Sequence, residues 1–275
     1  MDTLALCEAI GLAPEATAIV RQYEEREGHA YRTYKTAFWQ DREAMLTAVR
    51  ERADYRQLLL YLFARFAADA HEAYCVRGIS DDIFVDTFSD IRIWSEVCKQ
   101  QYGEYGIEES GWLQEHVRLA LFRLGRLQFQ PWALDRDITA NGRRYTKDQI
   151  VLNVHIPAGE PLDPEAAAAS FAQARAFFRG VPPVFVCASW LLYPGLGELL
   201  PPDSNIMRFQ RGFHIYAADD AARQAEERIF GCLRDDPAEY ETRTGLQRRA
   251  QAYLAGGGKL GMGSGIYAIE EEGAG

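Results

Sequence analysis

The stretch Leu152–Glu165 reads LNVHIPAGEPLDPE and indicates how the second half of the chain is built. An apolar run ends at His155, a Pro-Ala-Gly turn follows, and Asp163 and Pro164 have the residue types of a helix N-cap and of a first helical position. A strand, a tight turn and a helix N-terminus are therefore expected in this order. Many proteins bind a phosphate or a reactive carbonyl group at such a turn, because backbone N–H groups point out of it.

Further strands and helices are expected on both sides of this stretch. Residues 127–134 alternate with period two, and Asn141-Gly142 is a strong hairpin signal ahead of the strand at 150–156. The continuous apolar run 183–192 has the pattern of a central strand that is buried on both faces. Two more strands are expected in RGFHIYAA (211–218) and KLGMGSGIYAIE (259–270), with helices between them.

The part of the chain before residue 124 has a helical pattern throughout. Leu58, Leu62 and Phe66 recur at a spacing of four and give one helix a broad apolar face. Ser80 has the residue type of an N-cap for the next helix. The fold class that we predict is α+β, with an all-helical domain at 1–112 and a mixed α/β sheet domain at 113–275.

Composition and charge exclude several classes of partner. The net charge is −10, and residues 1–110 hold 12 Lys and Arg against 20 Asp and Glu, which argues against a nucleic-acid partner. The most apolar run, 58–70, is shorter than the about 20 residues of a membrane span, and the N-terminus does not resemble a signal peptide. The five cysteines are widely spaced and include no CxxC pair, which is typical of reduced thiols. We expect a cytoplasmic protein with a small-molecule substrate and no metal site, and its oligomeric state stays open.

Three phrases resemble a bacterial family of acyltransferase-domain proteins. They are LNVHIPAGEPLD (152–163), CASWLLYPGLGELLPPDSNIMRFQRGF (187–213) and TGLQRRAQAYLAGGGKLGMGSG (244–265), and the likeness covers about residues 10–268. Members of the family pair a helical N-acyltransferase N-terminal domain with a GNAT-like C-terminal domain. The resemblance implies that acyl-CoA is a co-substrate, and that no cofactor is tightly bound.

The resemblance also implies where acyl-CoA would lie. In GNAT-like enzymes two adjacent parallel strands separate, the thioester lies in the gap, and the loop after the first strand surrounds the CoA pyrophosphate. Here these elements correspond to Ile150–Ile156, Pro164–Arg179 and Val184–Ser189. The loop departs from the usual pattern, because two prolines remove N–H donors and Glu160 adds a negative charge. This argues against CoA binding in the usual mode.

Four residues are candidates for catalysis. His155 ends a strand at the point where the two strands would separate, so it could act as a general base on an acceptor amine. Cys187 could form a covalent acyl intermediate, or Ser189 could protonate the leaving thiolate. His214 could pair with His155, but two histidines without a third ligand do not indicate a metal site.

A second group of residues is predicted to bind the co-substrate. Its members are the loop glycine, the backbone of the second strand, and polar or basic side chains that could hold a carbonyl or phosphate group: Gly159, Phe185, Val186, Asn205, Arg208, Arg211 and Lys259.

Three functions remain open from the sequence, and it leaves undecided whether the protein is an enzyme. The first is an acyl-CoA-dependent N-acyltransferase acting on a small or aminated acceptor. The second is a non-catalytic small-molecule-binding protein on a GNAT-like scaffold, which the altered loop favours. The third is a hydrolase that uses Cys187 with His155 or His214.

Overall fold

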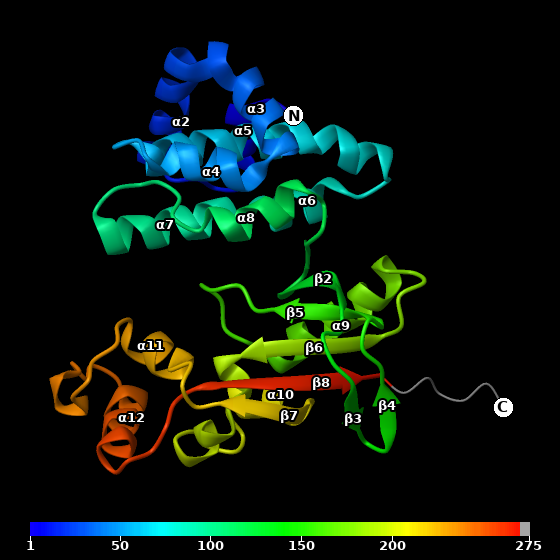
Figure 1. Cartoon of the computed structure of the whole chain (residues 1–275), viewed down its shortest axis with the longest axis vertical. Coiled ribbons are helices and arrows are strands. Elements are labelled where there is room, and N and C mark those ends of the chain that lie inside the picture. The colour runs from blue at the N-terminus through cyan, green and yellow to red at the C-terminus, as the bar shows by residue number, and fades with distance from the viewer. Residues whose placement is uncertain (270–275) are drawn as a thin grey trace. The chain divides into compact units, whose positions relative to one another are not determined.

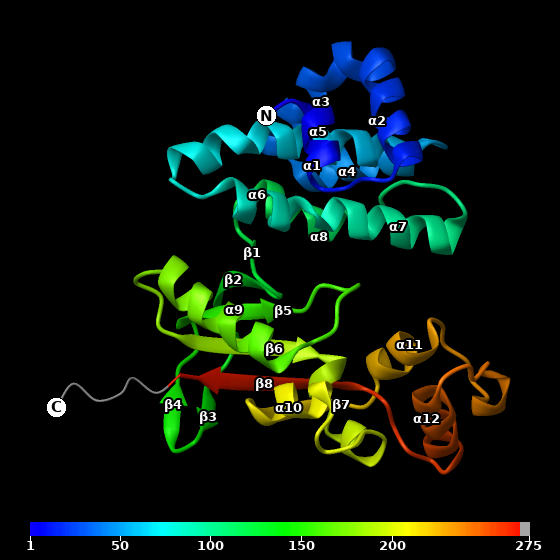
Figure 2. The same ribbon diagram turned by 180° about the vertical axis from the view of Figure 1, so that it is seen from behind.

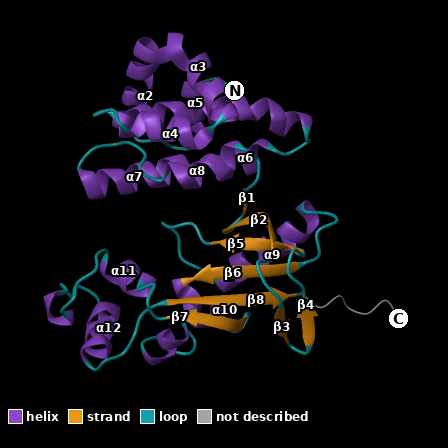
Figure 3. Cartoon of the chain, in the orientation of Figure 1, coloured by secondary structure: helices purple, strands orange, loops and turns teal. Residues whose placement is uncertain are grey.

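The computed structural model describes residues 1–269 and divides the chain into two compact units. The first unit comprises residues 1–124 with Pro157–Gly159, and the second comprises residues 125–156 and 160–275. The boundary that the sequence suggested, between residues 112 and 113, falls inside the helix Ser110–Val117. Figure 3 shows helices in the first part of the chain and strands in the second, so the α+β fold class is confirmed.

The first unit is built around one long helix, α5 (Tyr55–Val76), which contacts seven other helices. Every side chain from Leu58 to Ala64 is buried, which confirms the predicted apolar face and extends it around the helix. Ser80 caps α6 as predicted, because its Oγ accepts a hydrogen bond from the Ile83 N–H. The surrounding helices are α1 (Thr3–Ala9), α2 (Pro14–Glu27), α3 (Tyr31–Gln40), α4 (Arg42–Arg50), α6 (Asp81–Phe88), α7 (Asp90–Tyr102) and α8 (Ser110–Val117), and the short strand β1 (Phe122–Leu124) follows.

The second unit has a sheet in which β2 (Leu127–Ala133), β5 (Ile150–His155), β6 (Val184–Ser189), β8 (Met262–Ala268) and β7 (His214–Asp219) lie in this order. Strands β5 and β6 are parallel, and every other pair among these five is antiparallel. The last strand, β8, is inserted between β6 and β7 (red in Figure 1). The central strand predicted for the run 183–192 is confirmed for Val184–Ser189, whereas Trp190–Leu192 form a 3-10 helix.

Two different layers cover the two faces of this sheet. Figure 2 shows α9 (Pro164–Phe177) and α10 (Asn205–Arg211) on one face, where Phe171 of α9 packs on Phe185 of β6. The other face carries the hairpin of β3 (Ile138–Ala140) and β4 (Arg143–Tyr145), whose Asn141 and Gly142 both have positive φ, as its turn type requires. Helices α11 (Gln224–Phe230) and α12 (Gly245–Ala255) precede β8.

Glycines in and before β8 allow other chain segments to approach the sheet. A Cβ atom at Gly263 would lie 2.1 Å from the Leu192 carbonyl oxygen, and one at Gly261 would lie 2.0 Å from the Asp219 carbonyl oxygen. The bare face of this strand therefore accommodates backbone of the same chain. No helix among residues 1–269 is long and apolar enough to cross a membrane.

Candidate functional site

The pairing of β5 and β6 stops before either strand ends. The parallel register comprises Leu152 opposite Phe185 and Asn153 opposite Val186. Strand β5 continues to His155, where it still pairs with β2, and β6 continues to Ser189, where it still pairs with β8. Backbone groups of β6 beyond Val186 that point toward β5 therefore have no partner in that strand. The carboxyl ends of these two strands form the candidate site.

His155 lies at this end of β5 and is half-buried. Asn153, two residues earlier on the same face of the strand, places its amide nitrogen Nδ2 3.2 Å from His155 Nε2. An amide nitrogen donates, so Nε2 is the acceptor of this hydrogen bond in the tautomer whose proton is on Nδ1. A ring nitrogen in this state can take a proton from a reacting amine. Sequence reasoning did not single out Asn153, although its spacing of two from His155 is a signal that it shares a face.

Cys187 points to the opposite face of the sheet from His155. Because Asn153 pairs with Val186, the side chains of Asn153, His155 and Val186 share the hairpin face, and Cys187 lies on the face that α9 and α10 cover. The Cys187 side chain is 1% exposed, and its burial raises the pKa of the thiol to about 12. The structure therefore does not bring Cys187 and His155 together as a nucleophile and base.

Ser189 ends β6 and is half-buried. Its Oγ accepts a hydrogen bond of 3.2 Å from the Leu191 N–H, which caps the 3-10 helix η2 (Trp190–Leu192). The hydroxyl hydrogen of Ser189 is not used in this bond, so it can be donated to a ligand. Phe185 and Val186, in contrast, are buried in the core, so only their backbone groups could contact a ligand.

The loop after β5 is held by its carbonyl groups. Arg126 donates through Nε to the Pro161 carbonyl oxygen at 2.9 Å and through Nη2 to that of Glu160 at 2.7 Å. The Asp163 carboxylate accepts from the Ala166 N–H and caps α9, as predicted. Gly159, which is exposed, has a φ of +93°, a value that favours glycine. Arg126 was not among the predicted residues, because nothing in its local sequence points to the loop.

His214 is not brought together with His155. In the strand register, His214 of β7 pairs with Ile266 of β8. Ile266 pairs in turn with Val186 of β6, and Val186 pairs with Asn153 of β5. Two strands thus separate β7 from β5, a distance of about 14 Å for strand spacings of about 4.8 Å. The predicted pair of histidines does not form.

The remaining candidates lie on exposed surfaces. Asn205 and Arg208 are exposed on α10, and the Arg211 side chain donates to the Pro202 carbonyl oxygen. Lys259 is exposed between α12 and β8. Among residues 1–269, none of these four side chains forms a hydrogen bond or ion pair with β5 or with the end of β6, so their role in phosphate binding stays a prediction.

Comparisons with known proteins agree with this architecture. Residues 121–267 match the model of the GNAT-like C-terminal domain, and residues 1–119 match that of the N-acyltransferase N-terminal domain. These two matches confirm the resemblance that the sequence phrases indicated. No curated protein matches the chain.

Several solved structures of acyltransferases have the same fold. One, in complex with decanoyl-CoA, is 26% identical over 80% of this chain and 68% of its own, with a TM-score of 0.67. A mutant acyltransferase in complex with octanoyl-CoA is 22% identical over 97% of this chain and 87% of its own, with a TM-score of 0.75. A third, in complex with decanoyl-CoA and teicoplanin, is 22% identical over 98% of this chain and 100% of its own, with a TM-score of 0.67.

Proposed function

The chain belongs to the family defined by the GNAT-like C-terminal domain, here preceded by an N-acyltransferase N-terminal domain, and we propose from this that it is an acyl-CoA-dependent N-acyltransferase. Its acceptor is a small or aminated molecule. The observation that carries the proposal is the end of β5–β6 pairing at Asn153 and Val186, while both strands continue. The open backbone edge of β6 gives an acyl thioester a place to bind. The acyltransferase complex with decanoyl-CoA supports a medium-chain acyl group.

In the proposed reaction the acceptor amine attacks the thioester carbonyl carbon directly. A C–N bond forms and the C–S bond breaks, which yields an amide and the thiolate of CoA. His155 Nε2 takes the proton that the amine nitrogen loses. A backbone N–H group of the open part of β6, at Cys187 or Ala188, stabilises the oxyanion, and the Ser189 hydroxyl protonates the leaving thiolate. The proton on His155 then returns to solvent, while Ser189 regains one.

Several features support these roles over the alternatives. In the tautomer in which His155 Nε2 accepts from the Asn153 amide, an amine N–H of the acceptor can replace that donor. A hydrolase that relies on Cys187 is disfavoured, because the thiol is buried on the opposite face and its pKa is raised. A cytoplasmic location belongs to the proposal as well, since acyl-CoA is an intracellular metabolite and the cysteine spacing is typical of reduced thiols.

The proposal is tested by combining ligand binding with product analysis. The wild-type chain is incubated with decanoyl-CoA and a panel of primary amines, and N-acyl products and free CoA are measured by mass spectrometry. We expect a rise of Tm that scales with acyl-CoA concentration and an amide product. His155→Ala should lower kcat by about 10²–10⁴-fold and keep the Tm rise. The matched control His214→Ala should retain turnover, since β6 and β8 lie between its strand and β5.

The other outcomes have separate meanings. No Tm rise at millimolar acyl-CoA and no product would contradict the proposal. A Tm rise without product from any amine would favour the small-molecule-binding protein, in which the loop held by Arg126 and capped by Asp163 serves binding alone. Loss of turnover in His214→Ala but not in His155→Ala would assign the base elsewhere.

A further inference from the structure

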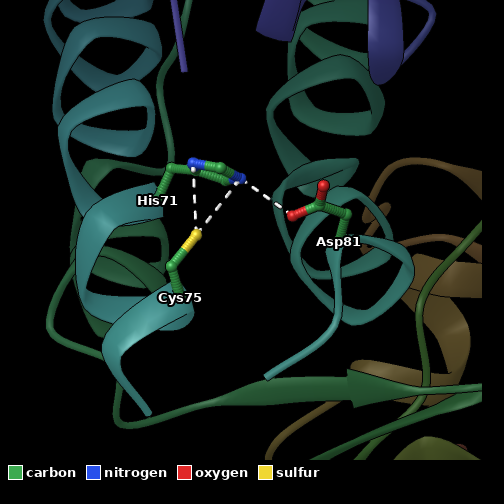
Figure 4. Close-up of side chains that lie close together, drawn as sticks. All are labelled: His71, Cys75 and Asp81. Atoms are coloured by element: carbon green, nitrogen blue, oxygen red, sulfur yellow. Dashed lines mark hydrogen bonds and ion pairs between the residues drawn. The ribbon is translucent and has the colours of Figure 1, made fainter. Parts of the chain in front are cut away.

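We propose a metal site in the helical unit, formed by His71, Cys75 and Asp81. One ligand atom from each residue lies within 4.8 Å of the ligand atoms of the other two. Figure 4 shows the three side chains directed toward one another, with His71 and Cys75 on one helix and Asp81 on the next. Neither the comparisons nor the proposed acyl transfer accounts for this group.

The local sequence explains why the three residues meet. His71 and Cys75 are four residues apart on α5, so their side chains are neighbours on one face of the helix. The helix ends at Val76, Gly78 adopts a φ of +67°, and the chain turns directly into α6, of which Asp81 is the first residue. Asp81 is therefore brought back to the last two turns of α5.

The orientation of the histidine ring is fixed by packing. The ring of His71 lies edge-on against the ring of Phe84, with 4.8 Å between centroids, and Phe84 is fully buried. In this orientation Nε2 lies 2.8 Å from Asp81 Oδ1 and 3.9 Å from Cys75 Sγ. Nδ1 lies 3.4 Å from the Met1 amino nitrogen. Nδ1 also lies 3.7 Å from Cys75 Sγ, so the thiol is about equally far from the two ring nitrogens, and Nε2 is the nitrogen that contacts the carboxylate.

These separations are close to those of a tetrahedral zinc site. With metal–ligand bonds of about 2.0–2.3 Å, neighbouring ligand atoms of a tetrahedron are about 3.3–3.6 Å apart. The Nε2–Oδ1 and Nε2–Sγ separations of 2.8 and 3.9 Å are within about 0.5 Å of these values. The thiol and the carboxylate lie within 4.8 Å of one another, and the exposed Cys75 and Asp81 side chains would turn toward a common ion. The Asp81 side chain is 69% exposed and can move without disturbing the core.

The ligand types favour Zn²⁺ over the hard cations. Thiolate and imidazole are preferred by Zn²⁺, Co²⁺ and Cu²⁺, whereas Mg²⁺ and Ca²⁺ prefer oxygen ligands. Cys75 and Asp81 are exposed, so an ion has a direct path from solvent, and a water molecule can complete a fourth position. Binding releases the proton of the Cys75 thiol, because the thiolate is the ligand. The usual zinc-ligand spacings are absent from the sequence, since two of the three ligands form a single His-x-x-x-Cys pair.

The test uses the full chain, stripped of metal by a chelator and titrated with Zn²⁺ and with Co²⁺ alone. We expect one Zn²⁺ per chain by calorimetry, and with Co²⁺ a near-ultraviolet thiolate charge-transfer band. Cys75→Ser should abolish that band. It should also weaken Zn²⁺ binding by at least about 100-fold, since even the loss of an outer-shell partner costs 10–100-fold.

Two matched variants keep the test decisive. Cys232→Ser removes the partly exposed thiol of the second unit and should leave both the stoichiometry and the Co²⁺ band unchanged. Asp81→Asn removes the carboxylate at an exposed position and should weaken Zn²⁺ binding without lowering the Tm of the metal-free chain. Unchanged Zn²⁺ affinity in both Cys75→Ser and Asp81→Asn, or a Co²⁺ spectrum without a thiolate band, would overturn the assignment.

Discussion

His155 and Cys187 lie on opposite faces of the sheet, so the two side chains cannot act on each other. Strand alternation places Cys187 and Ser189 on one face of β6, because it depends on neighbouring positions alone. Alternation does not tell whether His155 lies on that same face of the sheet, since this depends on how β5 and β6 are aligned, with Asn153 opposite Val186. The sequence also lacks the order of the strands in the sheet. His214 is therefore a possible partner of His155 in the sequence, although strands β6 and β8 lie between the two residues.

The burial of Cys187 leads to a prediction about its reactivity. A thiol pKa of about 12 instead of 9.0 lowers the thiolate fraction at neutral pH roughly a thousandfold. In the metal-free native chain, iodoacetamide should label Cys75 and Cys232 well before Cys187, as measured by mass spectrometry of peptides. Cys187→Ala should retain acyl transfer. Fast labelling of Cys187, or loss of turnover in a folded Cys187→Ala variant, would instead support a covalent mechanism.

At the scale of elements, the sequence predicts helix caps and turns, which depend on adjacent residues. It does not predict contacts between segments that are far apart in the chain. The caps at Ser80 and Asp163 and the Asn141-Gly142 turn depend on a few adjacent residues, so the sequence predicts them. The glycines of β8 leave one face of the strand bare, and the sequence alone does not distinguish another backbone segment from a ligand as their neighbour. The structure decides this in favour of backbone, because the Leu192 carbonyl group lies over Gly263.

Gly263→Ala should therefore destabilise the second unit. Its Cβ atom would lie 2.1 Å from the Leu192 carbonyl oxygen, so β8 or the segment around Leu192 must shift. We expect a loss of about 1–3 kcal/mol in the free energy of unfolding, measured by urea denaturation. Gly197→Ala is the matched control, since its Cβ atom meets only a methyl group at 3.7 Å, and it should change stability by less than about 0.5 kcal/mol. Equal stabilities of the two variants would show that the approach at Gly263 is not tight.

At the scale of the whole chain, the order of elements was predictable and the strand order was not. The sequence gives helices first and alternating strands and helices later, and the family models divide the chain in the same way, at 1–119 and 121–267. The insertion of the last strand, β8, between β6 and β7 follows from pairing between segments some 50–80 residues apart. This insertion keeps the end of β6 in the sheet, because β6 stays paired with β8 beyond the point where its pairing with β5 has ended. The edge of β6 that faces β5 is therefore open at the candidate site.

Hydrogen–deuterium exchange of the full chain shows whether acyl-CoA binds where β5 and β6 separate. Exchange is measured with and without saturating decanoyl-CoA. We expect slower exchange in peptides that cover residues 151–163 and 184–190, because the ligand occupies the open edge of β6 and the loop that follows β5. Ligand binding, established by calorimetry in the same buffer, with protection confined to peptides outside both segments would contradict binding at this site.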